Sequence, residues 1–156
     1  MPQNTFFDLL KHFLVTSVVT FFLWFKYRNP KLIIIAYLMG VLIDVDHFFD
    51  YLYYVVLKFG FWGIWHLNFS DFFDPSVYVK STDKVFVFLH GWEYLVVLWF
   101  FAQKLKKKIP GIHFALLIPY FFHLLIDQSP FIRAPLAYFF FIRLINNFNL
   151  SAFNGH

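Results

Sequence analysis

Aspartate and histidine side chains gather in one short stretch of an otherwise apolar sequence. The segment GVLIDVDHFFDY (40–51) places Asp44, Asp46, His47 and Asp50 directly after an apolar run. A lone carboxylate is costly to bury in apolar surroundings, because its charge loses the solvation of water. Carboxylate oxygens and imidazole nitrogens are common ligands of metal ions such as zinc. The stretch therefore indicates a metal site or, alternatively, a helix end whose acidic residues are solvated.

Other ionisable residues occur at spacings that suit one face of a helix. His90 and Glu93 are three residues apart, and His123 and Asp127 are four residues apart. Residues at these spacings are neighbours on a helix surface, so each pair can address one ligand. His12 stands in the first apolar segment. The alternative interpretations are a hydrogen-bonded bundle histidine for His12 and a simple hydrogen-bonded pair for His90 and Glu93.

The composition favours a membrane protein. Of the 156 residues, 60% are hydrophobic, 26% are aromatic and 14% are charged. Soluble proteins are about one quarter charged, and one small core cannot enclose 26 phenylalanines. Because cysteine is absent, disulfides and thiolate ligands are excluded. The net charge of +4 is modest and clustered, which speaks for a membrane-facing distribution and against a nucleic-acid partner.

Four segments are candidate membrane spans, since a span needs about 20 mainly apolar residues. They are residues 6–25, 32–56, 85–102 and 112–127. The first segment lacks a small-residue cleavage site, so we expect a retained span rather than a signal peptide. We predict an all-α fold: one membrane-embedded helical domain (1–156) of about four spans, plus an interfacial helix over 131–148. A fifth span at 131–148 is the alternative, and the short apolar runs also suit buried helices of a soluble domain.

Two basic loops orient these spans. Lys26, Arg28 and Lys31 follow the first segment, and the run 104–108 with four lysines follows the third. The positive-inside rule places both loops in the cytoplasm. The segment 58–84 balances three lysines against three aspartates. It therefore lies on the outer side.

Counting residues from the basic loops brings the ionisable groups to one level. At a rise of about 1.5 Å per residue, His12, Asp44, His90 and His123 each lie about 20–22 Å from the basic loops. Asp46, His47, Asp50 and Asp127 continue this layer outward, and Glu93 lies slightly deeper. Four helices would therefore meet at one depth, near the outer leaflet.

A metal centre explains this layer. Its carboxylates require a counter-charge, and Lys11 is the only lysine or arginine at the same height. The candidate ligands are His12, Asp44, Asp46, His47, His90, Glu93, His123 and Asp127, with Asp50 and Glu93 as catalytic carboxylates. They suit one to three zinc ions, and manganese or iron are alternatives. Such ions activate water and clamp a phosphoryl oxygen, so the implied chemistry is hydrolysis with a carboxylate that carries the proton.

The motifs GVLIDVDH, LHGWE and HLLID, with the early His12, resemble those of a family of integral-membrane metal-dependent hydrolases. That family includes the LexA-binding inner-membrane proteins and is distantly similar to zinc phospholipase C. The resemblance covers most of residues 8–127. It implies metal ligation by His12, Asp44, Asp46, His47, His90, His123 and Asp127. The chain departs from the family pattern at Ile43, where proline is usual, at Gly91, where serine is usual, and by the lack of a His-Arg pair before His90.

Three functions are compatible with these features. The first is a membrane-bound metal-dependent hydrolase that acts on a phosphoester or lipid headgroup at the outer face of the cytoplasmic membrane. Arg133 or Arg143 would then be available to hold a phosphate oxygen. The second is a transporter or proton pathway, because intramembrane acids and histidines also form relays. The third is a non-catalytic membrane interaction protein stabilised by the metal. The substrate and the oligomeric state are left open.

Overall fold

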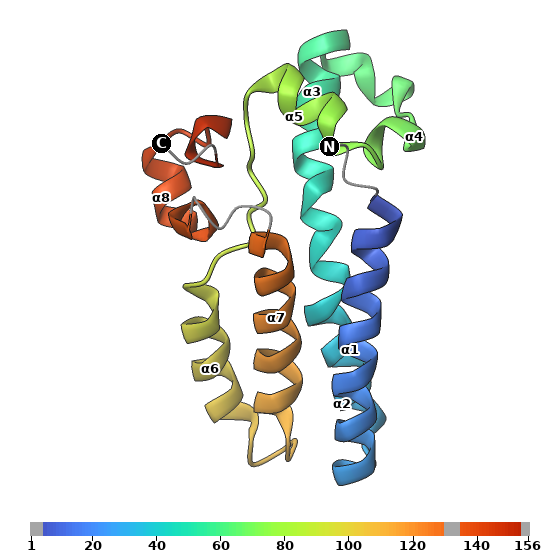
Figure 1. Ribbon diagram of the computed structural model, residues 1–156, viewed down its shortest axis with the longest axis vertical. Coiled ribbons are helices and arrows are strands. Elements are labelled where there is room, and N and C mark those ends of the chain that lie inside the picture. Colours follow the sequence, from blue (N-terminus) through green and yellow to red (C-terminus); the bar gives the residue numbers. More distant parts are fainter. Residues whose placement is uncertain (1–4, 130–134, 154–156) are drawn as a thin grey trace.

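The computed structural model describes residues 5–129 and 135–153, and these residues form an all-α fold (Figure 1). No β-strand occurs within these ranges, where Lys84 and Asn149 form one isolated antiparallel bridge. The predicted all-α class is therefore confirmed.

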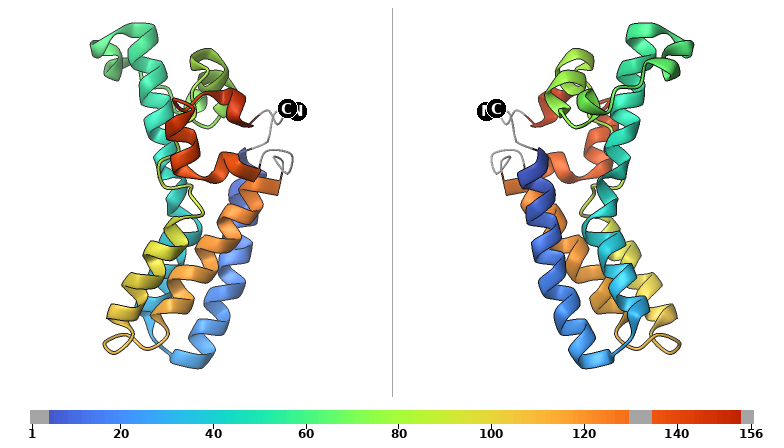
Figure 2. Two further views of the ribbon diagram at one scale, coloured as in Figure 1. Left: turned by 90° about the vertical axis from the view of Figure 1, so that its left-hand side faces the viewer. Right: turned by 90° about the vertical axis from the view of Figure 1, so that its right-hand side faces the viewer.

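Five helices form most of the structure: α1 (Thr5–Tyr27), α2 (Pro30–Gly40), α3 (His47–Phe59), α6 (Tyr94–Leu105) and α7 (Ile112–Gln128). Helix α7 packs against α1, α2 and α6, and α1 packs against α2. Helix α3 extends beyond this bundle (Figure 2). The shorter elements are η1 (Leu42–Asp46), η2 (Phe61–His66), α4 (Phe69–Phe72), α5 (Pro75–Thr82), η4 (Pro135–Tyr138), α8 (Phe140–Ile145) and η5 (Leu150–Phe153).

The second apolar segment is bent where three helices meet. Helix α2 begins after Asn29, whose side chain accepts the N–H of Lys31, with Pro30 at the first helical position. The segment then bends by 48° between Gly40 and Leu42. A Cβ atom at Gly40 would collide with Thr16 of α1 and approach Pro119 of α7. This close approach places the turn η1, with Asp44 and Asp46, beside α1 and α7.

The third apolar segment differs from the helix expected over 85–102, because α6 begins only at Tyr94. The backbone before it is irregular, and its N–H groups bind distant acceptors instead of helical carbonyls. Those of Phe86 and Val87 bind the carboxylate of Asp50, and that of Leu89 binds Asp46. His90 therefore lies on a loop that two buried carboxylates hold, and it shares no helix with Glu93.

The C-terminal region contains short turns instead of one helix over 131–148. Residues 135–153 form η4, α8 and η5, which are each four to six residues long. Residues 130–134, with Arg133, lie outside the described residues. Within the described part, no helix in this region is long enough for the alternative fifth span.

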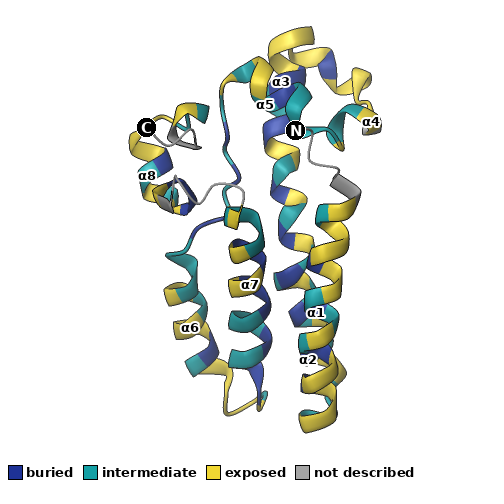
Figure 3. Cartoon of the chain, viewed as in Figure 1, coloured by how far each residue is buried: buried dark blue, intermediate teal, exposed yellow. Residues whose placement is uncertain are grey.

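Exposed residues cover much of the outside of the bundle (Figure 3), and many of them are large and apolar. The inner faces of α1, α2, α6 and α7 meet in a core that includes Leu32, Ala102 and Ile112. On the outside of α1, Phe22 and Phe25 are 66% and 60% exposed. Other exposed apolar residues on the same helix are Phe13, Leu14, Val18 and Phe21.

One described helix, Phe7–Tyr27, is long and apolar enough to cross a membrane. The bent segment from Pro30 to Phe59 is a second if it counts as one span. Helices α6 and α7 are apolar but shorter. Length and composition therefore leave the predicted four spans unconfirmed.

The contact at Gly40 predicts that a larger residue there destabilises the bundle. Gly40→Ala should lower the free energy of unfolding by about 1–3 kcal/mol, because the added methyl group must displace Thr16. Ile34→Ala removes an exposed side chain on the same helix and should have a much smaller effect. Unfolding of both variants in detergent, without metal, measures the difference, and equal effects would contradict the close packing at Gly40.

Candidate metal centre

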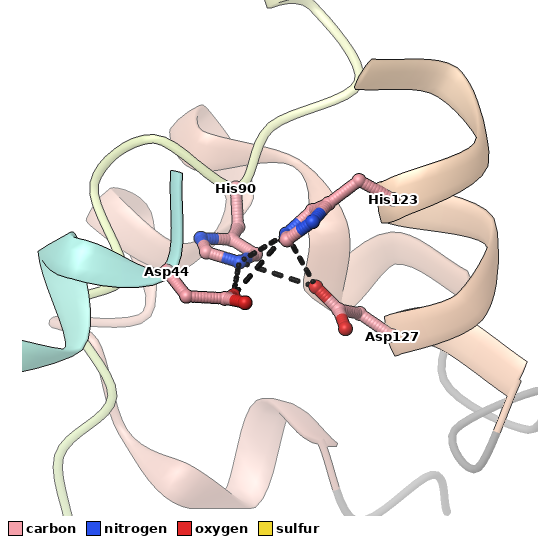
Figure 4. A group of neighbouring side chains, drawn as sticks. All are labelled: Asp44, His90, His123 and Asp127. Carbon is pink, nitrogen blue, oxygen red and sulfur yellow. Dashed lines mark hydrogen bonds and ion pairs between the residues drawn. The ribbon is translucent and has the colours of Figure 1, made fainter. Parts of the chain in front are cut away.

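Four side chains from three parts of the chain converge on one point (Figure 4). Asp44 comes from η1, His90 from the loop before α6, and His123 and Asp127 from α7. The Nε2 atoms of His90 and His123 are 2.9 Å apart. Oδ1 of Asp44 lies 3.2 Å and 3.3 Å from these two nitrogens, and Oδ2 of Asp127 lies 3.1 Å and 3.0 Å from them.

These separations fit a shared divalent ion. Ligands about 2.0–2.2 Å from a tetrahedral zinc ion lie about 3.3–3.6 Å from one another, so the group is slightly tighter than a loaded site. Oδ2 of Asp127 is buried and has no hydrogen-bond partner in the described part of the chain, despite two imidazole nitrogens close to it. Two carboxylates would balance a divalent charge. This His/Asp group can therefore hold a metal ion.

A hydrogen-bond acceptor at Nδ1 orients each of the two histidine rings. Nδ1 of His123 lies 3.2 Å from the carbonyl oxygen of Gly40, and Nδ1 of His90 lies 3.1 Å from Oδ2 of Asp46. Because these oxygens accept hydrogen bonds, they favour a proton on Nδ1 and leave Nε2 free for a metal. Asp46 is fully buried. A carboxylate that accepts a hydrogen bond from a metal-ligating histidine is common in metal sites, and Asp46 occupies this position.

Asp127 is supported in a similar way by His12. Nε2 of His12 lies 2.9 Å from Oδ1 of Asp127, on the carboxylate oxygen that does not face the other two histidines. The rings of His12 and His123 are 4.2 Å apart. His12 is therefore adjacent to the four-residue group without belonging to it.

The structure does not bring the remaining candidates to this point. Both oxygens of Asp50 accept backbone N–H groups of the loop. Oε1 of Glu93 accepts the N–H of Phe141. His47 is 33% exposed, and its ring lies 5.3 Å from that of His90.

Asp46, His47 and His90 form a second group that could hold an ion. The two groups share His90, and one neutral imidazole cannot offer both nitrogens as ligands, so they are alternatives. The arrangement of Asp44, His90, His123 and Asp127 offers four ligands and the second group three, so the first group better fits a tetrahedral ion.

Tyr120 and Tyr138, which the sequence motifs do not include, also position the ligands. The hydroxyl group of Tyr120 in α7 lies 2.8 Å from the carbonyl oxygens of Leu89 and Gly91, on either side of His90. That of Tyr138 donates to the carbonyl of Asp127. Burial raises the pKa of Tyr138 well above its ordinary value, so its proton stays available for this bond. In the sequence, both tyrosines stand in apolar runs without a polar neighbour that would mark them.

No protein-family model matches the chain, and no match is found among curated proteins or among solved structures.

The geometry predicts that His123 is essential for metal binding. His123→Ala removes a nitrogen that lies within 3.3 Å of three other candidate ligands, so the purified variant should no longer bind one equivalent of zinc, used as the probe ion. His113→Ala is the matched control, because His113 occupies the same helix but packs against Phe114 instead. Metal analysis of the full chain in detergent measures both. Equal zinc contents in the two variants would exclude the site.

Asp46 should change the affinity of the centre for zinc, whereas His123 should determine whether zinc binds at all. Asp46→Asn keeps an oxygen for the N–H of Leu89 but removes the charge behind His90, and we expect zinc to bind about 10- to 100-fold more weakly. Asp83→Asn removes an exposed carboxylate and controls for net charge. Competition with a chelator measures the dissociation constants. An unchanged constant in Asp46→Asn would show that Asp46 does not support His90.

Proposed function

We propose that this protein is a membrane-embedded metal-dependent hydrolase that acts on a phosphoester group. The observation that carries the proposal is the convergence of Asp44, His90, His123 and Asp127. The motif resemblance to integral-membrane metal-dependent hydrolases points to the same chemistry, with a zinc phospholipase C-like reaction.

The membrane part of the proposal has four crossings: α1, the bent segment of α2 and α3, the loop with α6, and α7. The outward faces of these elements support it. Phe100 and Phe101 on α6 are 58% and 56% exposed, and Phe121 and Leu125 on α7 are 41% and 47% exposed. Such side chains are compatible with lipid contact. Helix α1 also contributes His12 to the site, which favours a retained span over a removed signal sequence.

The site would lie toward the outer face of the cytoplasmic membrane. The loops between α1 and α2 and between α6 and α7 lie at the same end of the bundle (Figure 1). Seven of the 13 lysines and arginines lie in these loops or in the adjoining helix ends, and such basic segments normally face the cytoplasm. Asp127 is in the last turn of α7, at the end of the bundle opposite these basic loops.

Each residue of the centre has a separate part in the proposed reaction. Asp44, His90, His123 and Asp127 would hold the ion, and Asp46 and His12 would orient His90 and Asp127. When bound, a divalent ion supplies Lewis acidity that polarises a phosphoryl oxygen and makes water more acidic. The side chains of Asp44 and Asp127 are 29% and 18% exposed, whereas both histidines are buried, so a substrate would approach from the carboxylate side.

A proton carrier is also needed for hydrolysis. We assign this role to His47, because it is partly exposed beside His90 and imidazole is the side chain that most often transfers protons in enzymes. Asp50 and Glu93 suit the role less well, since each accepts backbone N–H groups that hold the local fold.

A non-catalytic protein with a structural metal is the second candidate. The four-ligand set favours it, because structural zinc sites are usually closed by four protein ligands while hydrolytic sites keep one position open. Partial exposure of both carboxylates favours the hydrolase. A transporter has no comparable support from a specific contact.

Activity of the purified protein separates these candidates. Full-length protein in detergent, supplied with zinc or manganese, should hydrolyse a soluble phosphodiester or a phospholipid. The activity should be lost on chelation and in His123→Ala, because both remove the ion, and it should persist in His113→Ala. His47→Gln should keep the metal but hydrolyse slowly. Stoichiometric metal without hydrolysis of either substrate class would favour the structural role.

A further inference from the structure

Arg143 is a buried cation directly behind the candidate metal centre. It belongs to α8, its side chain is fully buried, and its Nη2 atom donates to the carbonyl oxygen of His90 at 2.7 Å. Its Nε and Nη1 atoms have no hydrogen-bond partner among the described residues. An incompletely paired guanidinium is costly in such a place, so this position calls for an explanation beyond packing.

Arg143 is one of several contacts between the C-terminal segment and the ligand-bearing elements. The carbonyl oxygen of Tyr138 accepts the N–H of Trp92, and the hydroxyl group of Tyr138 donates to the carbonyl of Asp127. The N–H of Phe141 binds Glu93. The segment from Tyr138 to Arg143 therefore holds both the loop of His90 and the last turn of α7.

The charge of Arg143 complements that of Asp46. Burial lowers the pKa of Arg143 from its ordinary value, while the negative charges of Asp46 and Glu93 act in the opposite direction. A guanidinium remains protonated in proteins, so a positive charge stays behind the Asp46–His90 pair. Neither carboxylate forms an ion pair with Arg143, which leaves the carbonyl of His90 as its direct contact with the centre.

We propose that Arg143 is a positioning residue of the metal centre, which fixes the loop of His90 so that Nε2 faces Asp44, His123 and Asp127. The inference rests on the metal site of the proposed function and adds a role for α8. Through this contact, the C-terminal segment sets the affinity for the metal. A purely structural arginine would affect the stability of the metal-free protein and leave the affinity of the folded protein unchanged.

Two substitutions of Arg143 separate these roles. Arg143→Met removes the charge and the hydrogen bond. Arg143→Lys keeps a positive charge, but its side chain is shorter and lacks the planar guanidinium group. We expect zinc to bind about 10- to 100-fold more weakly to the methionine variant, with the lysine variant between it and the unaltered protein. The control variant Arg28→Met changes an exposed arginine in the loop between α1 and α2, and it should bind zinc as the unaltered chain does.

The measurements use the full chain in detergent. Competition with a chelator gives the zinc affinity, thermal unfolding in excess chelator gives the stability without metal, and the absorption of bound cobalt(II) reports the ligand geometry. A changed cobalt spectrum in Arg143→Lys, with weakened zinc binding, supports the proposal. Unaltered affinity and spectrum in Arg143→Lys overturn it, even if Arg143→Met does not fold. Failure of the unaltered protein to bind either ion overturns the proposed function itself, and this inference with it.

Discussion

Four aspartates lie inside or at the edge of an apolar helical bundle, and the rest of the structure depends on how their charges are compensated. Asp50 accepts two backbone N–H groups, and Asp46 accepts the N–H of Leu89 and faces His90. Among the described residues, only histidine rings lie within hydrogen-bond distance of the carboxylates of Asp44 and Asp127. A divalent ion between these two carboxylates would balance their charges and satisfy the orphaned oxygen of Asp127. That proposed ion is the basis of our functional account.

The same carboxylates also shape the polypeptide around the centre. Because Asp46 and Asp50 take the N–H groups of residues 86, 87 and 89, this part of the third apolar segment is not helical. The resulting loop places His90 between Asp44 of η1 and His123 of α7. Tyr120 and Arg143 bind carbonyl groups of the same loop. Acceptors from η1 and α3 and donors from α7 and α8 thus hold one short segment from several sides.

Local signals predict part of this structure. Apolar runs predict α1 and α7 to within about two residues at each end, because their helical hydrogen bonds are local. The start of α6 at Tyr94 is not predictable in this way, since the preceding segment is held by carboxylates 36 to 43 residues away. Counting residues from the basic loops selects His12, Asp44, His90 and His123 for one level. It does not reveal which ring nitrogen or carboxylate oxygen faces the shared point, so it cannot separate ligands from supporting residues such as Asp46.

Ligand identity at a bound ion tests the central claim most directly. X-ray absorption at the zinc edge of the loaded full-length protein reports the atoms around the ion and the number of imidazoles among them. We predict one zinc ion per chain, with nitrogen and oxygen ligands at about 2.0–2.2 Å and outer scattering from two imidazole rings. Zinc surrounded by water oxygens alone, without imidazole scattering, would contradict the account.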